Sequence, residues 1–259
     1  MRHRQATRRL SGNGWKAMHN LAWEELHTDL KVPMVELFET VEGEGRMAGY
    51  PTVFIRIFHC NLRCTWCDTT YSYAPEKPAF TASICEIVDR VSAYGHGVVC
   101  LTGGEPLMHG VKSLALVYHL ARIPHVWDIH IETNGAIDLQ PFQALREREK
   151  EVREKVRFVM DYKLPASGET ERMHVPNLAL LEERDEVKFV VGNEADFMYA
   201  LDVLKRHPTR ATALFSPVWE TMPPADLVSF LLKYRPQEGR ARLNMQIHKV
   251  IWDPEARGV

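Results

Sequence analysis

The sequence predicts an α/β protein whose core is an open, partial βα barrel of about six parallel strands. From Val32 onward, segments rich in Val, Ile and Phe alternate with segments of helical periodicity. Repeated βα units imply parallel strands with right-handed crossovers, and about six of them between residues 52 and 217 are too few for a closed barrel. We expect strands at 33–39, 52–59, 97–102, 127–132, 156–161, 186–191, 212–217 and 242–251.

Amphipathic segments between these strands predict helices. Thr81 and Asn193 are plausible amino-terminal caps for two of them. The run from Arg146 to Lys155 is dense in charge, which is typical of a solvated helix face. We expect helices at 81–94, 109–123, 140–155, 194–206 and 223–234.

Composition favours a cytoplasmic globular protein. The chain has 259 residues, 45% of them hydrophobic, which suffices for one well-buried core. The net charge of -2 gives no basic field for nucleic acid, and there is no apolar run of about 18 residues to span a membrane. Five cysteines, three of them clustered, do not form a disulfide framework and suit a reducing compartment. Apolar segments around Cys85 and Cys100 predict buried core thiols.

The first 31 residues differ from the rest of the chain. Met1 to Ala17 contain basic residues but no acid, and they lack apolar periodicity. An organelle-targeting peptide is one interpretation, but the acidic residues Glu24, Glu25 and Asp29 follow directly. We therefore expect residues 1–31 to be a poorly ordered extension and residues 32–259 to form the domain.

Three cysteines follow the strand expected at 52–59. Cys60, Cys64 and Cys67 have C-x3-C-x2-C spacing. Three thiolates on one turn can bind three irons of a four-iron, four-sulfur cluster and leave the fourth iron open for a substrate or cofactor. The alternative is a zinc site completed by a histidine such as His59. The cysteines favour the cluster without excluding zinc.

Polar residues follow several expected strands where each one ends. Strand 97–102 ends in Thr102-Gly103-Gly104-Glu105-Pro106, whose glycines let the backbone approach a ligand and whose Glu105 could accept from an ammonium group. The next strand ends in Glu132-Thr133-Asn134-Gly135, with polar groups able to hold a ribose. Each could be a simple capped strand end, but together with a cysteine loop they predict one active site. Two further strand ends carry Asp161-Tyr162-Lys163 and Ser216-Pro217-Val218-Trp219.

Together these motifs resemble the 7-carboxy-7-deazaguanine synthase family of the radical S-adenosylmethionine (SAM) superfamily, over residues 32–259. The cysteine loop, with Trp66 before its last cysteine, and Gly-Gly-Glu-Pro are typical of the superfamily and imply its partial barrel. The family usually has Gln where this chain has Glu42, which places an anionic side chain at an expected substrate contact. The motifs of the family are Glu42-Gly-Glu-Gly45, Arg56, Asp68-Thr69, Glu132-Thr-Asn-Gly135, Asp161-Tyr-Lys163 and Arg257-Gly-Val259.

The resemblance implies a reaction. The substrate would be 6-carboxy-5,6,7,8-tetrahydropterin, and the products 7-carboxy-7-deazaguanine and ammonia, in 7-deazapurine (queuosine) biosynthesis. An electron from a [4Fe-4S] cluster would cleave SAM to methionine and a 5′-deoxyadenosyl radical, which takes hydrogen from C6 of the pterin and returns it after ring contraction. The resemblance also implies Mg²⁺, a flavodoxin or ferredoxin as electron donor, and a homodimer, with no nucleic-acid or membrane partner.

The resemblance implies residue roles, and it leaves the radical chemistry to the cofactors. Cys60, Cys64 and Cys67 would ligate the cluster, and Thr69 would bind Mg²⁺ unless its hydroxyl only bonds its own backbone. The SAM contacts would be Trp66, Cys67, Asp68, Gly104, Asp161, Tyr162, Lys163, Ser216, Pro217, Val218 and Trp219. The substrate contacts would be Val41, Glu42, Gly43, Glu44, Arg56, Thr102, His248 and Val259.

Four of the substrate contacts have a chemical rationale. Glu44 could accept two hydrogen bonds from the pyrimidine edge, and Arg56 could grip the carboxylate. Arg56 lies in an apolar strand, where an unpaired guanidinium is costly. His248 is either a pocket residue or a core histidine, and Val259 offers a terminal carboxylate to the pyrimidine edge unless this end is frayed.

Two other functions are compatible with the cysteine loop. One is another small radical SAM enzyme, such as an activase that makes glycyl radicals on a partner protein. It would need a large docking face, and Glu42 to Gly45 together with Arg56 argue against it. The other is a non-catalytic zinc or iron–sulfur module.

Overall fold

The computed structural model describes residues 26–254 and 256–259. The strands are β1 (Lys31–Val41), β2 (Pro51–Ile57), β3 (Phe80–Ser83), β4 (Val98–Gly103), β5 (Asp128–Thr133), β6 (Val156–Asp161), β7 (Glu186–Val191), β8 (Thr212–Pro217) and β9 (Arg242–Leu243). The helices are α2 (Ile84–Tyr94), α3 (Val111–Ala121), α4 (Gln140–Arg148), α5 (Lys150–Lys155), α6 (Asn177–Leu180), α7 (Glu194–Arg206), α8 (Pro224–Tyr234) and α9 (His248–Ile251).

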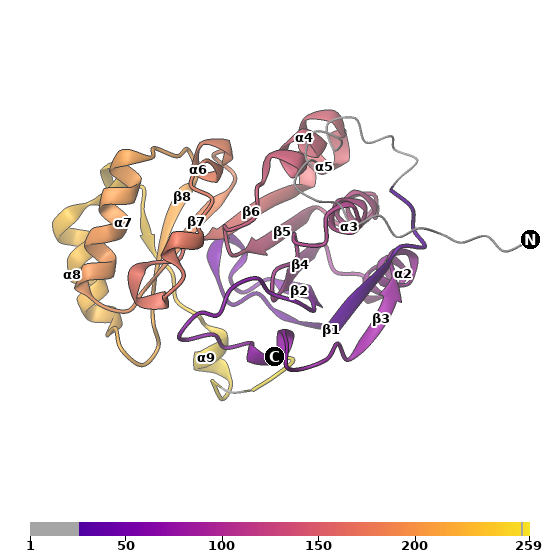
Figure 1. Cartoon of the computed structure of the whole chain (residues 1–259), viewed down its shortest axis with the longest axis horizontal. Coiled ribbons are helices and arrows are strands. Elements are labelled where there is room, and N and C mark those ends of the chain that lie inside the picture. Colours follow the sequence, from indigo (N-terminus) through magenta and orange to yellow (C-terminus); the bar gives the residue numbers. More distant parts are fainter. Residues whose placement is uncertain (1–25, 255) are drawn as a thin grey trace, which may run out of the picture.

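The strands form one curved sheet with the larger helices along its outer side (Figure 1). The strand order is β3-β1-β2-β4-β5-β6-β7-β8-β9. Strand β1 pairs antiparallel with both β3 and β2, and every neighbouring pair from β2–β4 to β8–β9 is parallel. The edge strands β3 and β9 do not pair with each other, so the predicted open barrel is confirmed. The strands expected between residues 52 and 217 are all present, and their apolar runs are buried, as parallel strands require. No helix within the described part of the chain has the length and apolar character to cross a bilayer.

The first residues of the helix expected at 81–94 belong to a strand instead. They form β3, which pairs with β1 at the edge of the sheet. Ser83 caps α2: its hydroxyl accepts the N–H of Glu86, whose side chain accepts the N–H of Ser83 in return. The expected cap at Thr81 is wrong because this reciprocal capping box, two residues later, determines where the helix begins.

The strand expected at 242–251 ends after two residues. The N–H of Asn244 still bonds the carbonyl of Phe215 at 2.8 Å, which extends the pairing of β9 with β8 by one residue. The chain then turns back: the N–H of Ile247 bonds the carbonyl of Gly43 at 3.0 Å, and α9 follows. The expected strand is wrong because this stretch makes contacts with a distant loop that its local pattern does not reveal.

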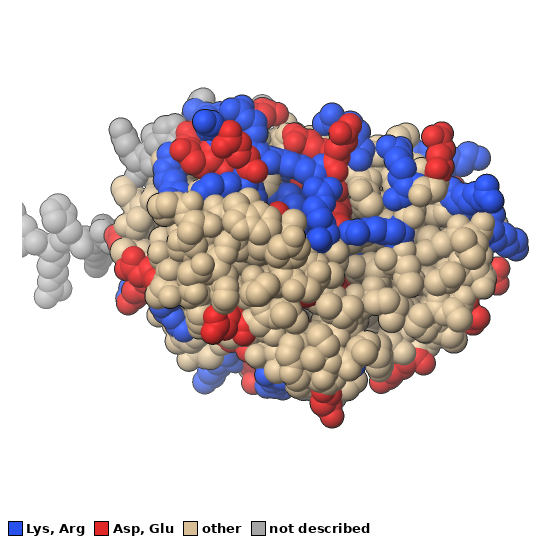
Figure 2. Space-filling view, turned by 180° about the vertical axis from the view of Figure 1, so that it is seen from behind, with Lys and Arg blue, Asp and Glu red and all other residues tan. Residues whose placement is uncertain are grey.

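The helix expected at 140–155 is divided into α4 and α5 at Glu149, whose backbone is extended. Arg146, expected on a solvated face, is only 1% exposed. Its guanidinium bonds both oxygens of Asp185 at 3.1 and 3.0 Å and one oxygen of Glu182 at 2.7 Å. Most other charged residues of this run do lie at the surface, where both signs of charge are interspersed (Figure 2).

Replacing Arg146 with lysine should lower the free energy of unfolding by about 1.5–3 kcal/mol. A lysine ammonium keeps the charge but cannot donate in the fork geometry that satisfies Asp185 and Glu182 together. The matched control is Arg153→Lys on exposed α5, which should change stability by less than about 0.5 kcal/mol. Urea unfolding of both variants measures the difference, and equal losses would contradict the structural role of Arg146.

The packed part of the domain includes the end of the expected extension. Residues 1–25 lie outside the described residues. Leu26 is 6% exposed and belongs to the core, and its carbonyl accepts a hydrogen bond from the ring of His119 at 2.7 Å. The carbonyls of Thr28 and Leu30 accept N–H groups from the first turn of α2 at 2.9 and 3.0 Å. Core packing therefore reaches further toward the amino terminus than the expected boundary.

The expected burial of the two isolated cysteines is half right. Cys100 is buried within β4, as predicted. Cys85 is exposed, because it lies on the outward face of the first turn of α2, where its thiol contacts Asp89 at 3.6 Å. At the start of α7 the predicted cap is confirmed, since the side chain of Asn193 accepts the N–H of Asp196 at 2.9 Å.

Candidate active site

A cavity of about 530 Å³ opens at the carboxyl ends of the parallel strands. This volume lies within the range of about 300–1,000 Å³ that is common for small-molecule sites. The end of β1, the cysteine loop after β2, the ends of the parallel strands and the segment around α9 form its wall. The predicted site residues that line it are Val41, Glu42, Gly43, Glu44, Arg56, Cys60, Cys64, Trp66, Cys67, Asp68, Thr69, Thr102, Gly104, Asp161, Lys163, Pro217, Val218, Trp219, His248 and Val259.

Two predicted SAM contacts, Tyr162 and Ser216, have side chains in the protein interior. Tyr162 is 4% exposed, its ring lies 5.8 Å from that of Phe189, and burial raises its pKa to about 12. The hydroxyl of Ser216 accepts a hydrogen bond from the amide of Asn244 at 2.9 Å. Neither residue lines the cavity.

The three loop cysteines are free, partly buried thiols. The sulfur of Cys60 accepts the N–H of Leu62 at 3.4 Å and contacts the amide nitrogen of Asn134 at 3.7 Å. Burial raises the pKa of the Cys60 thiol and raises that of Cys64 to about 11. Because metal ligands must be thiolates, binding of a cluster would release protons from this loop.

The three loop thiols are not gathered as the ligands of a single zinc ion would be. Sulfur ligands of a tetrahedral zinc ion lie roughly 3.8 Å apart, since each Zn–S bond is about 2.3 Å. Among the described residues, only Glu42, Cys100 and His130 bring three such ligand atoms within 4.8 Å of one another, so the loop sulfurs are too widely spaced. His59, considered as a fourth zinc ligand, is exposed and does not line the cavity. The loop is therefore suited to an iron–sulfur cluster.

Gly103 and Gly104 allow β4 to approach the strand that leads into the cysteine loop. A Cβ atom on Gly103 would lie 2.2 Å from the carbonyl oxygen of Ile57. A Cβ atom on Gly104 would lie 2.2 Å from the carbonyl oxygen of His59 and 2.9 Å from the Cβ atom of Cys60. The sequence analysis expected these glycines to let the backbone approach a ligand. The space that their missing Cβ atoms leave is instead taken up by the protein backbone.

Glu105 faces the protein interior, so the expectation that it binds an ammonium group is wrong. Its carboxylate is fully buried and accepts the hydroxyl of Thr133 at 2.9 Å. It also accepts the N–H groups of Asn134 at 2.7 Å and Leu107 at 2.9 Å. Burial raises its pKa to about 7. Glu105 instead joins the turn after β4 to the end of β5.

Glu44 is held by three nitrogen donors. One oxygen accepts from Lys188 at 3.1 Å and from Asn244 at 2.8 Å, and the other accepts from Gln246 at 2.8 Å. Burial opposes its ionisation, yet Lys188 and the Gln246 hydrogen bond lower the pKa of Glu44 to about 2. A carboxylate has about four acceptor positions, so roughly one position of Glu44 remains for a ligand. The sequence analysis expected Glu44 to accept two hydrogen bonds from the substrate.

Lys188 lies between two carboxylates, and the sequence analysis missed it. Its ammonium nitrogen is 3.1 Å from Glu44 and 3.6 Å from Glu132. Burial opposes its charge, but the two acids raise the pKa of Lys188 well above its usual value. Burial raises the pKa of Glu132 to about 7. A charged residue inside the apolar strand β7 was the available signal, as it was for Arg56.

Arg56 has a partner in the protein, so its position in an apolar strand does not by itself require a ligand. Its Nε donates to Glu36 at 2.7 Å, and the hydroxyl of Tyr71 donates to the same oxygen at 3.4 Å. Among the described residues, these bonds leave the two terminal guanidinium nitrogens of Arg56 without a hydrogen-bond partner. Arg56 lines the cavity, so its guanidinium can still pair with a carboxylate there.

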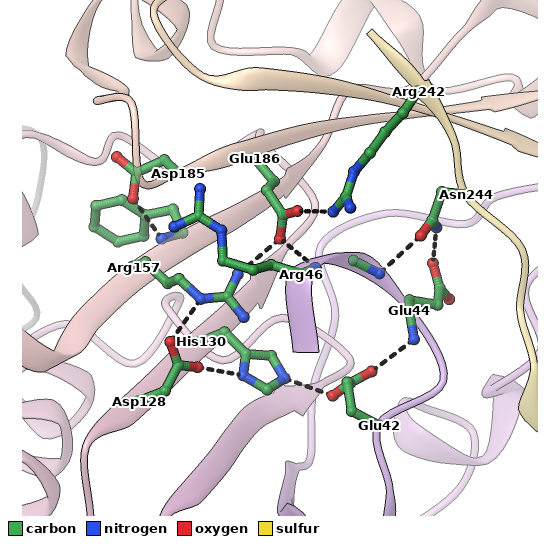
Figure 3. A network of polar contacts seen from close by, with 12 residues as sticks. Glu42, Glu44, Arg46, Asp128, His130, Arg157, Asp185, Glu186, Arg242 and Asn244 are labelled. Atoms are coloured by element: carbon green, nitrogen blue, oxygen red, sulfur yellow. Dashed lines mark hydrogen bonds and ion pairs between the residues drawn. The ribbon is translucent and has the colours of Figure 1, made fainter. Parts of the chain in front are cut away.

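Glu42 is directed into the protein rather than toward a ligand. It is 4% exposed, and one oxygen lies 2.5 Å from the ring nitrogen Nε2 of His130 (Figure 3). The other oxygen accepts the N–H of Glu44 at 3.1 Å. The anionic side chain that the sequence places here is therefore already paired.

Asp161 and Lys163 form an ion pair of 2.7 Å on the cavity wall. Burial opposes the charge of Lys163, but Asp161 raises its pKa above the usual value. The hydroxyl of Thr69 lies 3.7 Å from the sulfur of Cys67, and both residues line the cavity. An ion bound by that hydroxyl would be close to the cysteine loop.

The carboxyl-terminal segment forms part of the cavity wall. His248 packs so tightly on Gly43 that a Cβ atom there would lie 2.2 Å from its ring nitrogen Nδ1. Burial lowers the pKa of His248. The guanidinium of Arg257 lies 4.1 Å above the ring of Tyr71, and Val259 lines the cavity beside it. This end of the chain is thus in place to contact a ligand.

The chain is similar to known radical SAM proteins. Residues 54–160 match the radical SAM superfamily, which defines the class of the protein. The chain is 32% identical over 228 residues to the 7-carboxy-7-deazaguanine synthase of Clostridium acetobutylicum, covering 87% of this chain and 98% of that protein. It is 34% identical over 239 residues to the synthase of Chlorobaculum tepidum, covering 90% and 100%. The chain belongs to the 7-carboxy-7-deazaguanine synthase family.

A solved structure supports the fold. The crystal structure of QueE from Escherichia coli superposes with a TM-score of 0.62 at 21% identity, covering 86% of this chain and 96% of that one. The radical SAM partial barrel predicted from the sequence is therefore the fold of this protein.

Proposed function

We propose that this protein converts 6-carboxy-5,6,7,8-tetrahydropterin to 7-carboxy-7-deazaguanine and ammonia by radical ring contraction, in 7-deazapurine (queuosine) biosynthesis. Membership of the family supports the reaction class. The observation that carries the substrate proposal is the fixed, ionised Glu44 in the same cavity as the three-cysteine loop. Such an acceptor complements the N–H edge of a pterin. A glycyl-radical activase, which acts on a protein, would have no use for it.

The cavity residues would hold the cofactors in the way that the corresponding residues of the family do. Cys60, Cys64 and Cys67 would ligate three irons of a [4Fe-4S] cluster, leaving the fourth for the amino and carboxylate groups of SAM. When bound, the two cofactors supply the electron and the hydrogen-abstracting radical. The chain orients SAM through Trp66, Cys67, Asp68, Gly104, Asp161, Lys163, Pro217, Val218 and Trp219, and through main-chain atoms of Tyr162 and Ser216.

The substrate would be oriented by opposite charges on the cavity wall. Arg56 would pair with its carboxylate, while Glu44 and the terminal carboxylate of Val259 would accept from its pyrimidine edge. Contacts at both ends would fix the position of C6 relative to the SAM subsite, which favours hydrogen transfer over side reactions. Val41, Glu42, Gly43, Thr102 and His248 would complete the substrate pocket, with Glu42 acting through its protein contacts.

Three further assignments belong to this proposal. Thr69 would bind Mg²⁺ through a neutral hydroxyl, with substrate oxygens and waters completing the octahedron. A flavodoxin or ferredoxin would reduce the cluster. The enzyme would work in the cytoplasm as a homodimer.

Anaerobic turnover tests the proposed function. The purified protein, with reconstituted iron and sulfide, is incubated with SAM, reductant, Mg²⁺ and the carboxypterin. We expect about four irons per chain and a deazapurine product, detected by its absorption and mass, that is absent when SAM is omitted. A colourless zinc protein, or cleavage of SAM without any change in the pterin, would refute the proposal.

Adding residues after Val259 should raise the KM for the carboxypterin by about tenfold or more. A short carboxy-terminal tag moves the terminal carboxylate and crowds a cavity that Val259 lines. Cluster content and SAM affinity should not change. Val259→Ala is the matched control, since it keeps the carboxylate in place and should alter KM far less. Tagged enzyme with untagged kinetics would show that Val259 does not bind the substrate.

A further inference from the structure

A row of alternating charges runs from the cavity wall into the protein behind it (Figure 3). Glu42 contacts Nε2 of His130 at 2.5 Å, and Nδ1 of His130 contacts Asp128 at 3.0 Å. The other oxygen of Asp128 accepts from Arg157 at 2.8 Å, and Arg157 donates to Glu186 at 2.7 Å. These five residues are all less than 10% exposed. Each of the three acids therefore lies beside a base, and Arg242 supplies the third base by contacting Glu186 at 2.6 Å.

His130 occupies the position in this row where a positive charge is required. Each of its ring nitrogens faces a carboxylate, and only the imidazolium form can donate to both. Burial opposes this charge, but Cys100, Glu42 and Asp128 raise the pKa of His130 well above its usual value. These groups come from the end of β1, from β4 and from β5, and Arg157 on β6 lies behind Asp128.

The row also holds the loop that carries Glu44. At its cavity end, Glu42 accepts the N–H of Glu44 at 3.1 Å. Behind the loop, Glu186 accepts the N–H of Arg46 at 3.3 Å. Between these points, the N–H of Gly45 bonds the side chain of Asn244 at 2.7 Å. The two ends of the charge row thus bind the backbone at Glu44 itself and two residues later at Arg46.

We propose that His130 is a positioning residue for substrate binding: as a cation between Asp128 and Glu42, it holds the loop of residues 42–46 so that Glu44 faces the substrate. It does not line the cavity and so acts through Glu42. This inference rests on the proposed function for the identity of the substrate. It explains why an acid is tolerated at position 42, since the charge of Glu42 is compensated inside the protein.

A metal ion is the competing use of this cluster. Glu42, Cys100 and His130 have ligand atoms within 4.8 Å of one another. However, Glu42 and His130 approach to 2.5 Å, whereas two such ligands of a tetrahedral zinc ion lie roughly 3.3 Å apart. The contact is that of a charge-assisted hydrogen bond. The geometry therefore favours a proton between the two side chains.

The test compares His130→Gln, Glu42→Gln and the double variant with wild-type enzyme. The His130 variant should raise the KM for the carboxypterin by about 10- to 100-fold, while iron content and SAM affinity stay at wild-type values. The double variant should be no worse than the poorer single variant, because both changes remove one interaction. His119→Gln, which loses a bond to a backbone carbonyl far from the loop, is the matched control and should leave KM unchanged.

Hydrogen exchange provides a readout that does not depend on the substrate. The amides of Glu44 and Arg46 should exchange faster in His130→Gln, even if the carboxypterin proves not to be the substrate. If that variant does not fold, Asp128→Asn, which removes the other carboxylate beside His130, should show the same faster exchange. Wild-type exchange and wild-type KM in a folded His130 variant would overturn the proposal. Stoichiometric zinc in the wild type that is lost in His130→Gln would do so as well.

Discussion

Replacing Cys64 with alanine should give a folded protein that holds no [4Fe-4S] cluster and makes no product. Three irons of the cluster need three thiolates, and the loop offers only Cys60, Cys64 and Cys67. The half-buried thiol of Cys64 contributes little to the core, so the free energy of unfolding should change by less than about 1 kcal/mol. Iron analysis and the absorption spectrum of the anaerobic protein measure the loss, and the same result is expected for alanine at either of the other two positions.

The control for this prediction is Cys85→Ala. Cys85 is exposed on α2 and does not line the cavity, so its replacement should leave both the cluster and the turnover intact. A brown, active Cys64 variant beside a colourless Cys85 variant would reverse the ligand assignment.

Replacing Lys188 with methionine should lower the free energy of unfolding by about 3–5 kcal/mol and abolish most substrate binding. The change leaves the buried Glu44 and the partly buried Glu132 without their shared cation. At neutral pH one of them would then take up a proton, and a neutral Glu44 is a weaker acceptor for the substrate. Lys150→Met removes an exposed ammonium 3.9 Å from Glu154 and should cost less than about 0.5 kcal/mol.

The pH dependence of stability gives a second check on Lys188. The pKa of Glu44 is lowered from 4.5 to about 2, so its ionisation stabilises the fold above pH 4.5, and this contribution is lost as the pH falls toward 2. The Lys188 variant should lack that gain, which urea unfolding between pH 3 and 6 would reveal. Parallel stability profiles for the wild type and the variant would show that Lys188 does not control the charge of Glu44.

The fold could be predicted where the information is local. The parallel strands follow from apolar runs that must be buried on both faces. The edge strand β3 was missed because its four residues resemble a helix start, although Ser83 and Glu86 carried the capping-box signal. Residues 242–251 look like a strand, but the side chains of Asn244 and Gln246 turn toward Glu44, about 200 positions earlier in the chain. Contacts between residues so far apart leave no pattern in the local sequence from which they could be predicted.

The site residues that could be predicted are likewise those that belong to a local motif. The cysteine loop is a motif within eight residues, so its chemistry can be inferred without a structure. Lys188 reaches Glu44 across 144 positions, and His130 reaches Glu42 across 88. Spacing cannot predict such pairs, although a charged residue inside an apolar strand shows that a partner must exist. Glu105 illustrates the opposite error, since a polar residue in a ligand-binding motif is used to hold the protein together.

On the proposed function, one cavity binds the cluster at the cysteine loop and the pterin at Glu44. An anaerobic crystal structure with cluster, SAM and carboxypterin tests it most directly. We predict that the pyrimidine edge of the pterin lies within hydrogen-bonding distance, about 2.7–3.2 Å, of Glu44, with the substrate carboxylate on Arg56. A pterin bound elsewhere, or bound with its carboxylate toward Glu44, would contradict the account.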